Sequence, residues 1–232
     1  MVKWQEVERI RAVYRRREVM KLTTYNPLDI GAFYLLTSRD RYMIRILRTF
    51  LTPTRTLQEI RILDVGCGDG SVLRRLVLLG ARPENLCGID LLEEHIQHAQ
   101  QVSPNIRFIV GSAEILPFED ESWDLVLMFM IMSSILDSEM QHRVAAEVMR
   151  VLKPDGAILW YDFWTNPINP DTIGMTRARI RALFPGHPCK LRRITLAPPI
   201  ARRLARISWP LCWVLEAIPF LCTHYMGLIY KQ

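Results

Sequence analysis

The sequence predicts an α/β protein built on a doubly wound, mostly parallel sheet of seven strands. The first observation is that short apolar runs rich in Ile, Val and Leu alternate with longer helix-like stretches from Arg61 onward. The second is a glycine-rich turn that follows the first of these runs and opens a helix. The third is that 232 residues, half of them hydrophobic, are enough to bury the core of one such domain.

Five strands and three helices are expected in the alternating part of the chain. The strands are expected near 61–65, 86–90, 106–110, 123–130 and 157–163. The helices between them are expected over 70–79, 92–101 and 138–152, with Asp137 or Ser138 as the cap of the last. Lys153 to Gly156 is predicted to form the turn into the fifth strand, because proline cannot continue a helix and glycine tolerates positive φ.

The two ends of the chain follow different patterns. The first sixty residues look largely helical, and we expect residues 1–58 to form a helical cap on a domain over 59–232. After Phe163 we expect a helix from Thr172 to Leu183 and two further strands at 189–196 and 223–230. Between these strands, Ala201 to Ile218 predicts one or two short helices broken by Pro210, within an apolar helical segment over 198–222.

Charge is distributed unevenly along the chain. Residues 1–60 hold twelve Lys and Arg against six Asp and Glu, residues 61–174 hold eight against seventeen, and residues 175–232 hold ten against one. The basic flanks indicate an acidic substrate, nucleic acid or a membrane surface as partner, or else solvated faces, and both readings stay open. Five cysteines without C-x-x-C spacing and a charged N-terminus without a secretory signal predict a cytoplasmic protein without a metal site.

The glycine-rich turn separates two kinds of nucleotide ligand. Gly66, Gly68 and Gly70 follow the spacing G-x-G-x-G, whereas the dinucleotide fingerprint G-x-G-x-x-G needs a glycine where Ser71 stands. Asp64 precedes the first glycine by two residues, and a carboxylate there suits a ligand with an ammonium group but repels a pyrophosphate. The loop therefore argues against a nicotinamide dinucleotide as the ligand.

The segment from Asp64 to Gly70 resembles the first motif of class I S-adenosylmethionine-dependent methyltransferases. Four further segments resemble the family's motifs in the family's order, namely Cys87–Leu91, Gly111–Phe118, Trp123–Val126 and Arg150–Gly156. The resemblance implies a Rossmann-like methyltransferase fold, a methyl-transferring enzyme and S-adenosylmethionine as cofactor. It also implies that Asp90 binds both ribose hydroxyls and that the segment starting at Gly111 lies against the adenine.

The cofactor-binding residues expected from the resemblance lie in and beside these motifs. They are Asp64, Gly66, Cys67, Gly68, Gly70, Asp90, Leu91, Ser112, Ala113, Glu114, Phe129 and Arg39. Ser112 replaces the family's frequent Asp, which leaves Ser112, Glu114 or backbone to hold the adenine amino group. Ser133 and Ser134 stand where related small-molecule enzymes carry two histidines, and we expect them to position substrate or to cap a helix. The five histidines of the chain offer no obvious substitute base.

Methyl transfer from a sulfonium is an in-line displacement, so the enzyme mainly positions the nucleophile and manages its proton. Tyr161 and Asp162 are the candidate catalytic residues, because functional groups in open α/β sheets collect at the carboxyl ends of strands. In the family the segment before the first strand, here Tyr25 to Tyr34, commonly closes over the cofactor. Arg39 would then meet the methionine carboxylate, with a surface role as the alternative.

The C-terminal part resembles a subgroup of bacterial methyltransferases associated with polysaccharide and secondary-metabolite biosynthesis, through the segments Leu183–Gly186, Arg192–Pro199 and Thr223–Tyr225. We therefore expect a small-molecule acceptor such as a sugar, a lipid-linked saccharide or a secondary metabolite. A non-catalytic cofactor-binding partner subunit and an RNA methyltransferase stay open as alternatives, and the oligomeric state is not predicted. Glu216 interrupts the apolar C-terminal segment too early for a helix that spans a membrane. Arg202, Arg203 and Arg206 beside this segment leave peripheral membrane contact open.

Overall fold

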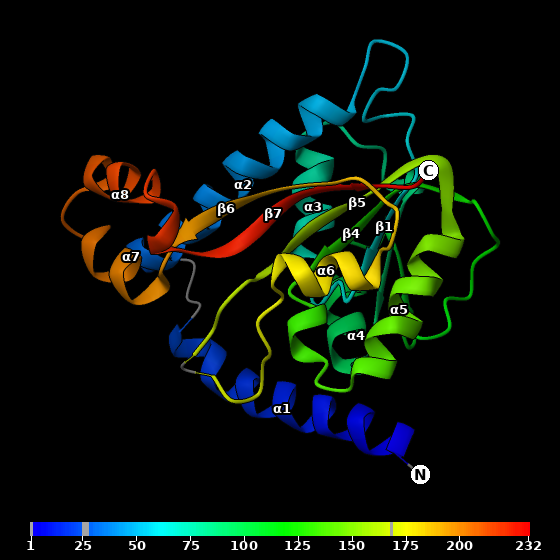
Figure 1. Ribbon diagram of the computed structural model, residues 1–232, viewed down its shortest axis with the longest axis horizontal. Coiled ribbons are helices and arrows are strands. Elements are labelled where there is room, and N and C mark those ends of the chain that lie inside the picture. Colours follow the sequence, from blue (N-terminus) through cyan, green and yellow to red (C-terminus); the bar gives the residue numbers. More distant parts are fainter. Residues whose placement is uncertain (1, 25–27, 168) are drawn as a thin grey trace.

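Seven strands form one sheet in the order β3-β2-β1-β4-β5-β7-β6 (Figure 1). The computed structural model describes residues 2–24, 28–167 and 169–232, and the side chains of all of these except 2–4 and 18–24. The strands are β1 (Ile62–Val65), β2 (Leu86–Asp90), β3 (Arg107–Val110), β4 (Trp123–Phe129), β5 (Leu152–Phe163), β6 (Cys189–Leu196) and β7 (Cys222–Tyr230). The predicted doubly wound, seven-stranded and mostly parallel sheet is confirmed.

The strand order reverses between β1 and β4 in the middle of the sheet. β1 runs parallel to β2 and β4, and β5 runs parallel to β4, whereas β7 is antiparallel to both β5 and β6. In open α/β sheets, ligands bind outside the carboxyl ends of the strands where the order reverses. This topology places the expected site beyond the carboxyl ends of β1 and β4.

Helices cover both faces of the sheet (Figure 1). They are α1 (Val2–Thr24), α2 (Ile30–Phe50), α3 (Ser71–Leu78), α4 (Glu93–Val102), α5 (Ser138–Val151), α6 (Arg177–Leu183), α7 (Pro198–Leu204) and α8 (Trp209–Glu216), with 3-10 turns η1 (Pro83–Asn85), η2 (Met132–Ser134) and η3 (Pro219–Leu221). Side chains of α2, α3 and α4 pack on one face, and those of α5 and α6 pack on the other. Because both faces are covered, β1 is apolar at consecutive positions, with Ile62 and Leu63 in opposite clusters.

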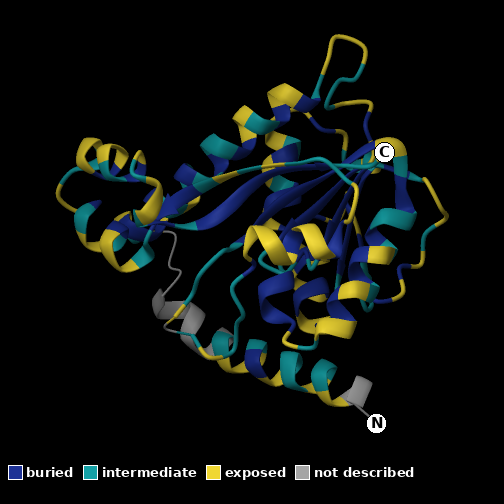
Figure 2. Cartoon of the chain, viewed as in Figure 1, coloured by how far each residue is buried: buried dark blue, intermediate teal, exposed yellow. Residues whose placement is uncertain are grey.

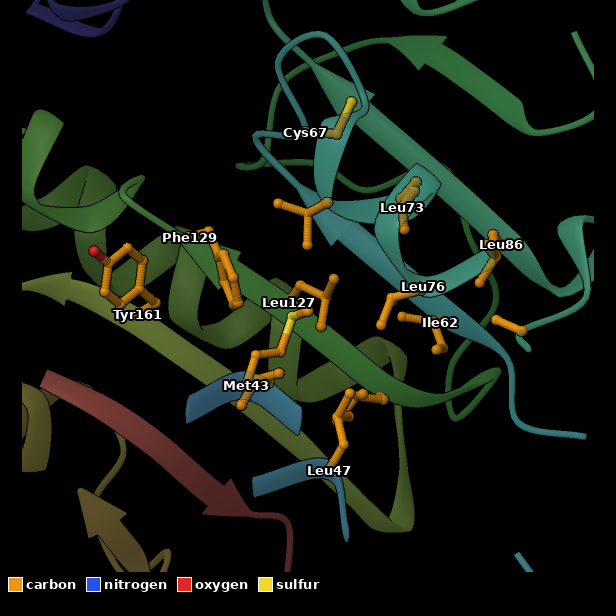
Figure 3. Packing of buried hydrophobic residues seen from close by; sticks show 14 of the residues in the cluster. Met43, Leu47, Ile62, Cys67, Leu73, Leu76, Leu86, Leu127, Phe129 and Tyr161 are labelled. Carbon is orange, nitrogen blue, oxygen red and sulfur yellow. The ribbon is translucent and has the colours of Figure 1, made fainter. Parts of the chain in front are cut away.

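The core on the α2 face joins elements that are far apart in the sequence (Figure 3). Met43 and Leu47 of α2 pack with Leu73 and Leu76 of α3 against Leu127 of β4, and each of the five is at most 3% exposed. Burying one such side chain contributes roughly 1.5–3 kcal/mol. The helix α2 is therefore part of the sheet's own core.

The predicted helix from Thr172 to Leu183 is wrong in its first part, since α6 begins at Arg177. The backbone N–H groups of Ile173 and Met175 donate instead to the carbonyls of Ser133 and Phe163. These tertiary hydrogen bonds hold the segment extended. The side chain of Thr176 then accepts from the Arg179 N–H and caps the shorter helix.

The predicted turn over Lys153 to Gly156 lies within strand β5. Trp123 pairs with Leu152 and Leu125 pairs with Ala157, so four residues of β5 stand opposite the single residue Asp124. The Asp124 carboxylate accepts from Lys153 Nζ at 2.8 Å and from the Arg61 N–H at 2.8 Å. The segment is thus an irregularity inside a strand, stabilised by one charged side chain.

The two C-terminal helices project beyond one end of the sheet (Figure 1). The prediction of short helices between the last two strands is confirmed, although α7 begins already at Pro198. Pro210 lies in the first turn of α8, where a missing backbone N–H costs nothing. Figure 2 shows that much of the surface of these helices is exposed.

Candidate active site

A cavity of about 210 Å³ lies beyond the carboxyl ends of β1, β2, β3 and β4. Its lining comes from the glycine loop, from the ends of the three other strands and from α1, which runs along the outside of the molecule below α4 and α5 in Figure 1. The lining residues are Ile10, Tyr14, Gly66, Gly68, Ile89, Asp90, Leu91, Leu92, His95, Gly111, Ser112, Ala113, Phe129, Met130, Ile131, Ser134, Ile135 and Met140. The cavity therefore has a wall built from the sheet and a wall built from α1.

The glycine loop turns the chain sharply from β1 into α3. Gly66, Gly68 and Gly70 have φ of +74°, +54° and +75°, in the left-handed region that L side chains rarely adopt. A Cβ on Gly70 would lie 2.6 Å from Cζ of Phe108, whereas a Cβ on Gly68 would meet nothing within 4 Å. Gly70 is thus needed for packing, and Gly68 leaves its backbone accessible to a ligand.

Asp90 ties the glycine loop to the end of β2. Its Oδ2 accepts from the Gly68 N–H at 2.8 Å, and its Oδ1 accepts from the Leu92 N–H at 2.9 Å. Nδ1 of His95 lies 3.3 Å from the same Oδ1. Each carboxylate oxygen has two acceptor sites, so Oδ2, which accepts only from Gly68, keeps capacity for a ligand in the cavity. His95 is a cavity residue that the sequence analysis missed, although its position five residues after Asp90 was visible.

Asp64 is buried beneath the loop, with 1% of its surface exposed. Neither of its carboxylate oxygens has a hydrogen-bond partner among the described residues. Burial raises the pKa of Asp64 to about 8, and the negative charge of Asp90 acts in the same direction. The nearby positive charge of Arg39 lowers it. A buried carboxylate without partners is costly, and a cationic ligand group would compensate it.

Arg39 lies on α2 outside the set of cavity-lining residues. Its Nε and Nη2 donate to Oδ1 of Asp40 at 3.1 and 2.8 Å, and Arg75 Nε contacts the other oxygen of Asp40 at 2.8 Å. The guanidinium is therefore held in place beside Asp64. Of the segment predicted to close over the cofactor, Tyr25, Asn26 and Pro27 lie outside the described residues.

The end of β4 contributes an apolar part of the lining. Phe129 lies on the strand, and Met130 follows it with φ of +61°, a conformation that costs a non-glycine residue free energy. The Met130 N–H donates to the Tyr161 carbonyl at 2.7 Å, which holds the turn. Met130, with its strained backbone, thus lines the cavity.

The α1 wall consists of Ile10 and Tyr14, one helical turn apart. The Tyr14 hydroxyl lies 2.9 Å from Oγ of Ser134. Burial raises the pKa of Tyr14, so this hydroxyl is protonated at neutral pH. The sequence analysis missed both residues, although Val7, Ile10 and Tyr14 recur at the spacing of a buried helix face.

Ser133 and Ser134 have different surroundings. Ser134 lines the cavity beside Tyr14, whereas Ser133 is fully buried and its N–H donates to Oδ2 of Asp162 at 2.9 Å. Oδ1 of Asp162 accepts from the Phe163 N–H, and burial raises the pKa of Asp162 to about 6. Tyr161 stacks on His224 with ring centroids 4.7 Å apart. Tyr161 and Asp162 lie behind the cavity lining, and their catalytic role stays a prediction.

The predicted cofactor residues divide into two groups. Those that line the cavity are Gly66, Gly68, Asp90, Leu91, Ser112, Ala113 and Phe129. Those outside the lining are Asp64, Cys67, Gly70, Glu114 and Arg39. Glu114 is buried in an ion pair with Arg143 Nε at 2.6 Å, and Cys67 belongs to the core. Among the described residues, no group of three or more His, Cys, Asp and Glu side chains is placed to hold a metal ion.

A family model described as a methyltransferase domain matches residues 62–156. The phthiotriol/phenolphthiotriol dimycocerosates methyltransferase 1 of Mycobacterium ulcerans is 38% identical over 113 residues, which cover 44% of this chain and 37% of that protein. The ubiquinone biosynthesis O-methyltransferase of Maricaulis maris is 32% identical over 143 residues, which cover 60% of this chain and 51% of that protein. The chain thus spans about half or less of the length of these relatives.

Solved structures resemble the whole sheet. A SAM-dependent methyltransferase of Methanosarcina mazei superposes with a TM-score of 0.60 at 20% identity, over 80% of this chain and 96% of that chain. A putative sarcosine dimethylglycine methyltransferase of Galdieria sulphuraria gives a TM-score of 0.62 at 18% identity, over 84% and 85%. These likenesses establish the fold. Taken with the family match over residues 62–156 and the curated relatives, they support a class I S-adenosylmethionine-dependent methyltransferase domain in that part of the chain, whose cofactor is S-adenosylmethionine.

Proposed function

We propose that this protein methylates a hydroxyl group of an apolar small molecule. The observation that carries the proposal is the cavity with two unlike walls. One wall presents the glycine loop and the Asp90 carboxylate, and the other presents apolar side chains with two hydroxyls, those of Tyr14 and Ser134. A methyl donor and an apolar acceptor need opposite surroundings, and this cavity offers both.

The loop wall fits the cofactor of the family. The open space beside Gly68 allows a ligand to approach the backbone, and Asp90 retains acceptor capacity for ribose hydroxyls. The partnerless carboxylate of Asp64 fits an ammonium group, as the sequence predicted. Ser112 and Ala113 line the cavity on the adenine side that the resemblance implies, whereas Glu114 is occupied by Arg143.

The α1 wall and the segment from Ser134 to Met140 that it faces fit the acceptor. Ile10, Ile135 and Met140 supply apolar surface, and the Tyr14–Ser134 pair can donate to or accept from one acceptor hydroxyl. In this proposal the cap expected over residues 1–58 is formed by α1, while α2 belongs to the core of the domain expected over 59–232. Asp162 is a positioning residue, because its hydrogen bond to the Ser133 N–H holds the turn that carries Ser134.

Bound S-adenosylmethionine supplies a methyl group on a positively charged sulfur. Gly68, Asp64 and Asp90 would hold this cofactor, and its methyl group would pass to the acceptor oxygen while the sulfur would keep the electron pair of the broken carbon–sulfur bond. The hydroxyl proton passes to water. The chain contributes by holding the two reactants in line, since orientation can supply roughly 7–11 kcal/mol of a barrier.

The named relatives support the class of acceptor. Two of them carry names that refer to phthiotriol lipids and to ubiquinone biosynthesis, and a third relative, from Mus musculus, is named an arsenite methyltransferase. We infer a lipid-like or isoprenoid-like acceptor for this chain and keep a lipid-linked saccharide as the runner-up. The five cysteines are free thiols, and four of them are buried, which fits the cytoplasmic setting that the sequence predicted.

The test combines calorimetry with turnover. We expect S-adenosylmethionine to bind and NADH not to bind, and we expect turnover with hydroxylated lipids or quinols that exceeds turnover with sugars, with RNA oligomers as a further arm. Mass spectrometry of the product identifies the methylated atom. Cofactor binding without turnover of any apolar acceptor would reject the acceptor class and favour the partner-subunit alternative. Failure to bind the cofactor would reject the enzyme itself.

A further inference from the structure

Helix α8 has apolar side chains on its outer face as well as on its inner face. Pro210, Leu211, Trp213 and Val214 are exposed, while Cys212 is fully buried. Their spacing corresponds to one continuous face of a helix. A helix that is apolar all round is normally buried on all sides, either in a protein or in lipid. The outer face of α8 is open to solvent among the described residues.

Hydrogen bonds between α8 and α2 fix the orientation of α8. Glu216 is 4% exposed, and its carboxylate accepts from Ser38 Oγ, from Arg41 Nη2 at 2.5 Å and from the Tyr34 hydroxyl at 3.4 Å, all on α2. The Ser208 side chain caps the other end of the helix by accepting from the Leu211 N–H. These contacts prevent α8 from turning its outer face toward the core.

Further exposed apolar side chains flank α8 along the chain. Ile207 precedes α8 and is 82% exposed, and Phe220 follows it in η3 and is 73% exposed. We define the apolar lobe as Ile207, Leu211, Trp213, Val214 and Phe220. Figures 1 and 2 show this part of the chain projecting beyond the sheet with much of its surface exposed. These five exposed side chains come from one projecting lobe, and monomeric proteins seldom leave large apolar patches uncovered without an interaction.

The charge around the apolar lobe is mainly positive. Within residues 198–222 there are three arginines, Arg202, Arg203 and Arg206, and one acid, Glu216, which is engaged with Arg41. Arg203 and Arg206 are exposed on and just after α7, and Arg206 also pairs with Asp29. Trp209 and Trp213 are residues of the kind that settles at the membrane–water interface. An apolar surface with a basic border complements an anionic lipid surface.

The apolar lobe lies at the same edge of the sheet as the cavity. The last residue of β6, Leu196, pairs with the first residue of β7, Cys222, and α7 and α8 connect the two. β7 starts beside the carboxyl end of β5, where Phe163 pairs with His224. The carboxyl ends of the parallel strands, and with them the cavity, therefore face the end from which the lobe projects.

We propose that the apolar lobe docks the protein on a bilayer that contains anionic lipids. Ile207, Val214 and Phe220 insert at the acyl boundary, and the arginines of α7 contact the headgroups. No described helix has the length and apolar content to cross a bilayer. The proposed contact is peripheral, with the lobe at the interface. Docking brings the cavity edge of the sheet to the membrane. The proposal is independent of the acceptor's identity, because it concerns a different surface.

The test is flotation of the full chain with vesicles of phosphatidylcholine alone or with phosphatidylglycerol added. We expect co-flotation with the anionic vesicles at low salt and its loss at high salt. The combined variant Ile207→Ser, Val214→Ser, Phe220→Ser should bind the anionic vesicles roughly tenfold or more weakly. The matched control is Leu78→Ser, Val102→Ser, Ile115→Ser, whose side chains are 77%, 50% and 72% exposed elsewhere. This control should bind like the natural chain.

A second pair of variants separates charge from apolar contact. Arg203→Gln should weaken binding to anionic vesicles roughly fivefold, as expected for one basic residue at the surface, whereas the exposed Arg179→Gln on α6 should not. Circular dichroism confirms that each variant is folded. The proposal is overturned if the natural chain does not float, or if the control loses binding as the lobe variant does. It is also overturned if light scattering shows a dimer that only the lobe variant dissociates, because a second copy then covers the lobe.

Discussion

The two walls of the cavity are built in different ways. The loop wall uses Gly66, Gly68 and Asp90, which lie within 25 residues of one another, and the Gly68 N–H donates to the Asp90 carboxylate. The α1 wall uses Ile10 and Tyr14, and α1 meets the segment after β4 across about half the chain, through the Tyr14–Ser134 hydroxyl contact and hydrogen bonds of Arg9 and Glu6 to its backbone. The comparison teaches that a short motif creates the proposed cofactor side, whereas the proposed acceptor side depends on how distant segments pack.

The largest loss of folding stability is expected for Gly70→Ala. Its φ of +75° costs an alanine about 1–2 kcal/mol, and the clash of the new Cβ with Phe108 adds about 1–3 kcal/mol. Gly186→Ala is the control, since Gly186 has φ of +80° with nothing within 4 Å of the added Cβ. Urea unfolding should show a clearly larger loss for Gly70→Ala, together with weaker cofactor binding. Equal losses in the two variants would show that packing at Gly70 is unimportant.

The second effect concerns the carboxylate that joins the loop to β2. Asp90→Ala removes the acceptor of the Gly68 and Leu92 N–H groups and of the expected ribose hydroxyls, and cofactor binding should weaken by about 1–3 kcal/mol. Asp90→Asn keeps one acceptor oxygen and should lose less. Calorimetry measures both. If the folded alanine variant kept the natural dissociation constant, Asp90 would not belong to the cofactor site.

The third effect is a pH dependence from Asp64. Because its pKa is raised from 3.8 to about 8 in the folded state, the folded protein holds this proton between these values while the unfolded chain has released it. The stability of the cofactor-free protein should therefore fall as pH rises within this window, by at most about 1.4 kcal/mol per pH unit from this group. Asp64→Asn should lose that slope between pH 6 and 8 in urea titrations. Parallel slopes for both proteins would place the titration elsewhere.

The smallest effect is expected in acceptor binding, for a variant of the α1 wall. Tyr14→Phe removes the hydroxyl that meets Ser134, which should cost about 0.5–1.5 kcal/mol in acceptor binding and leave cofactor affinity unchanged. The readout is KM for the acceptor with the highest turnover, beside the dissociation constant of the cofactor. Tyr42→Phe on α2, outside the cavity lining, is the control. A change in cofactor affinity alone would contradict the assignment of α1 to the acceptor.

The strands were the most predictable part of the fold. β2, with both faces covered, appears at the predicted residues 86–90, because a buried strand reads as a short apolar run. The start of α6 was not predictable, since Ile173 and Met175 bond to carbonyls of Ser133 and Phe163 that only the folded chain brings near. The predicted turn over Lys153 to Gly156 was wrong for a similar reason. A proline and a glycine indicate a turn whether or not a strand continues around them.

The residues of the candidate site also differ in how far the sequence predicts them. Gly66, Gly68 and Asp90 could be named from the sequence because the chemistry of a close backbone approach and of a strand-end carboxylate is local. Glu114 was named as well, yet Arg143 on α5 takes its carboxylate, and no spacing in the sequence announces that pair. His95 and Tyr14 went unnamed because their place in the cavity depends on where α4 and α1 lie.

The sequence by itself determined the sheet, the glycine loop and the identity of the strand-end carboxylate. Each of these follows from short-range rules, namely apolar periodicity, the steric freedom of glycine and the alternation of strand and helix. Only the tertiary structure decided that α1 closes the cavity and that the outer face of α8 stays exposed. Both outcomes depend on packing between residues more than a hundred positions apart, such as Tyr14 with Ser134 and Ser38 with Glu216, for which the linear sequence carries no periodic signal.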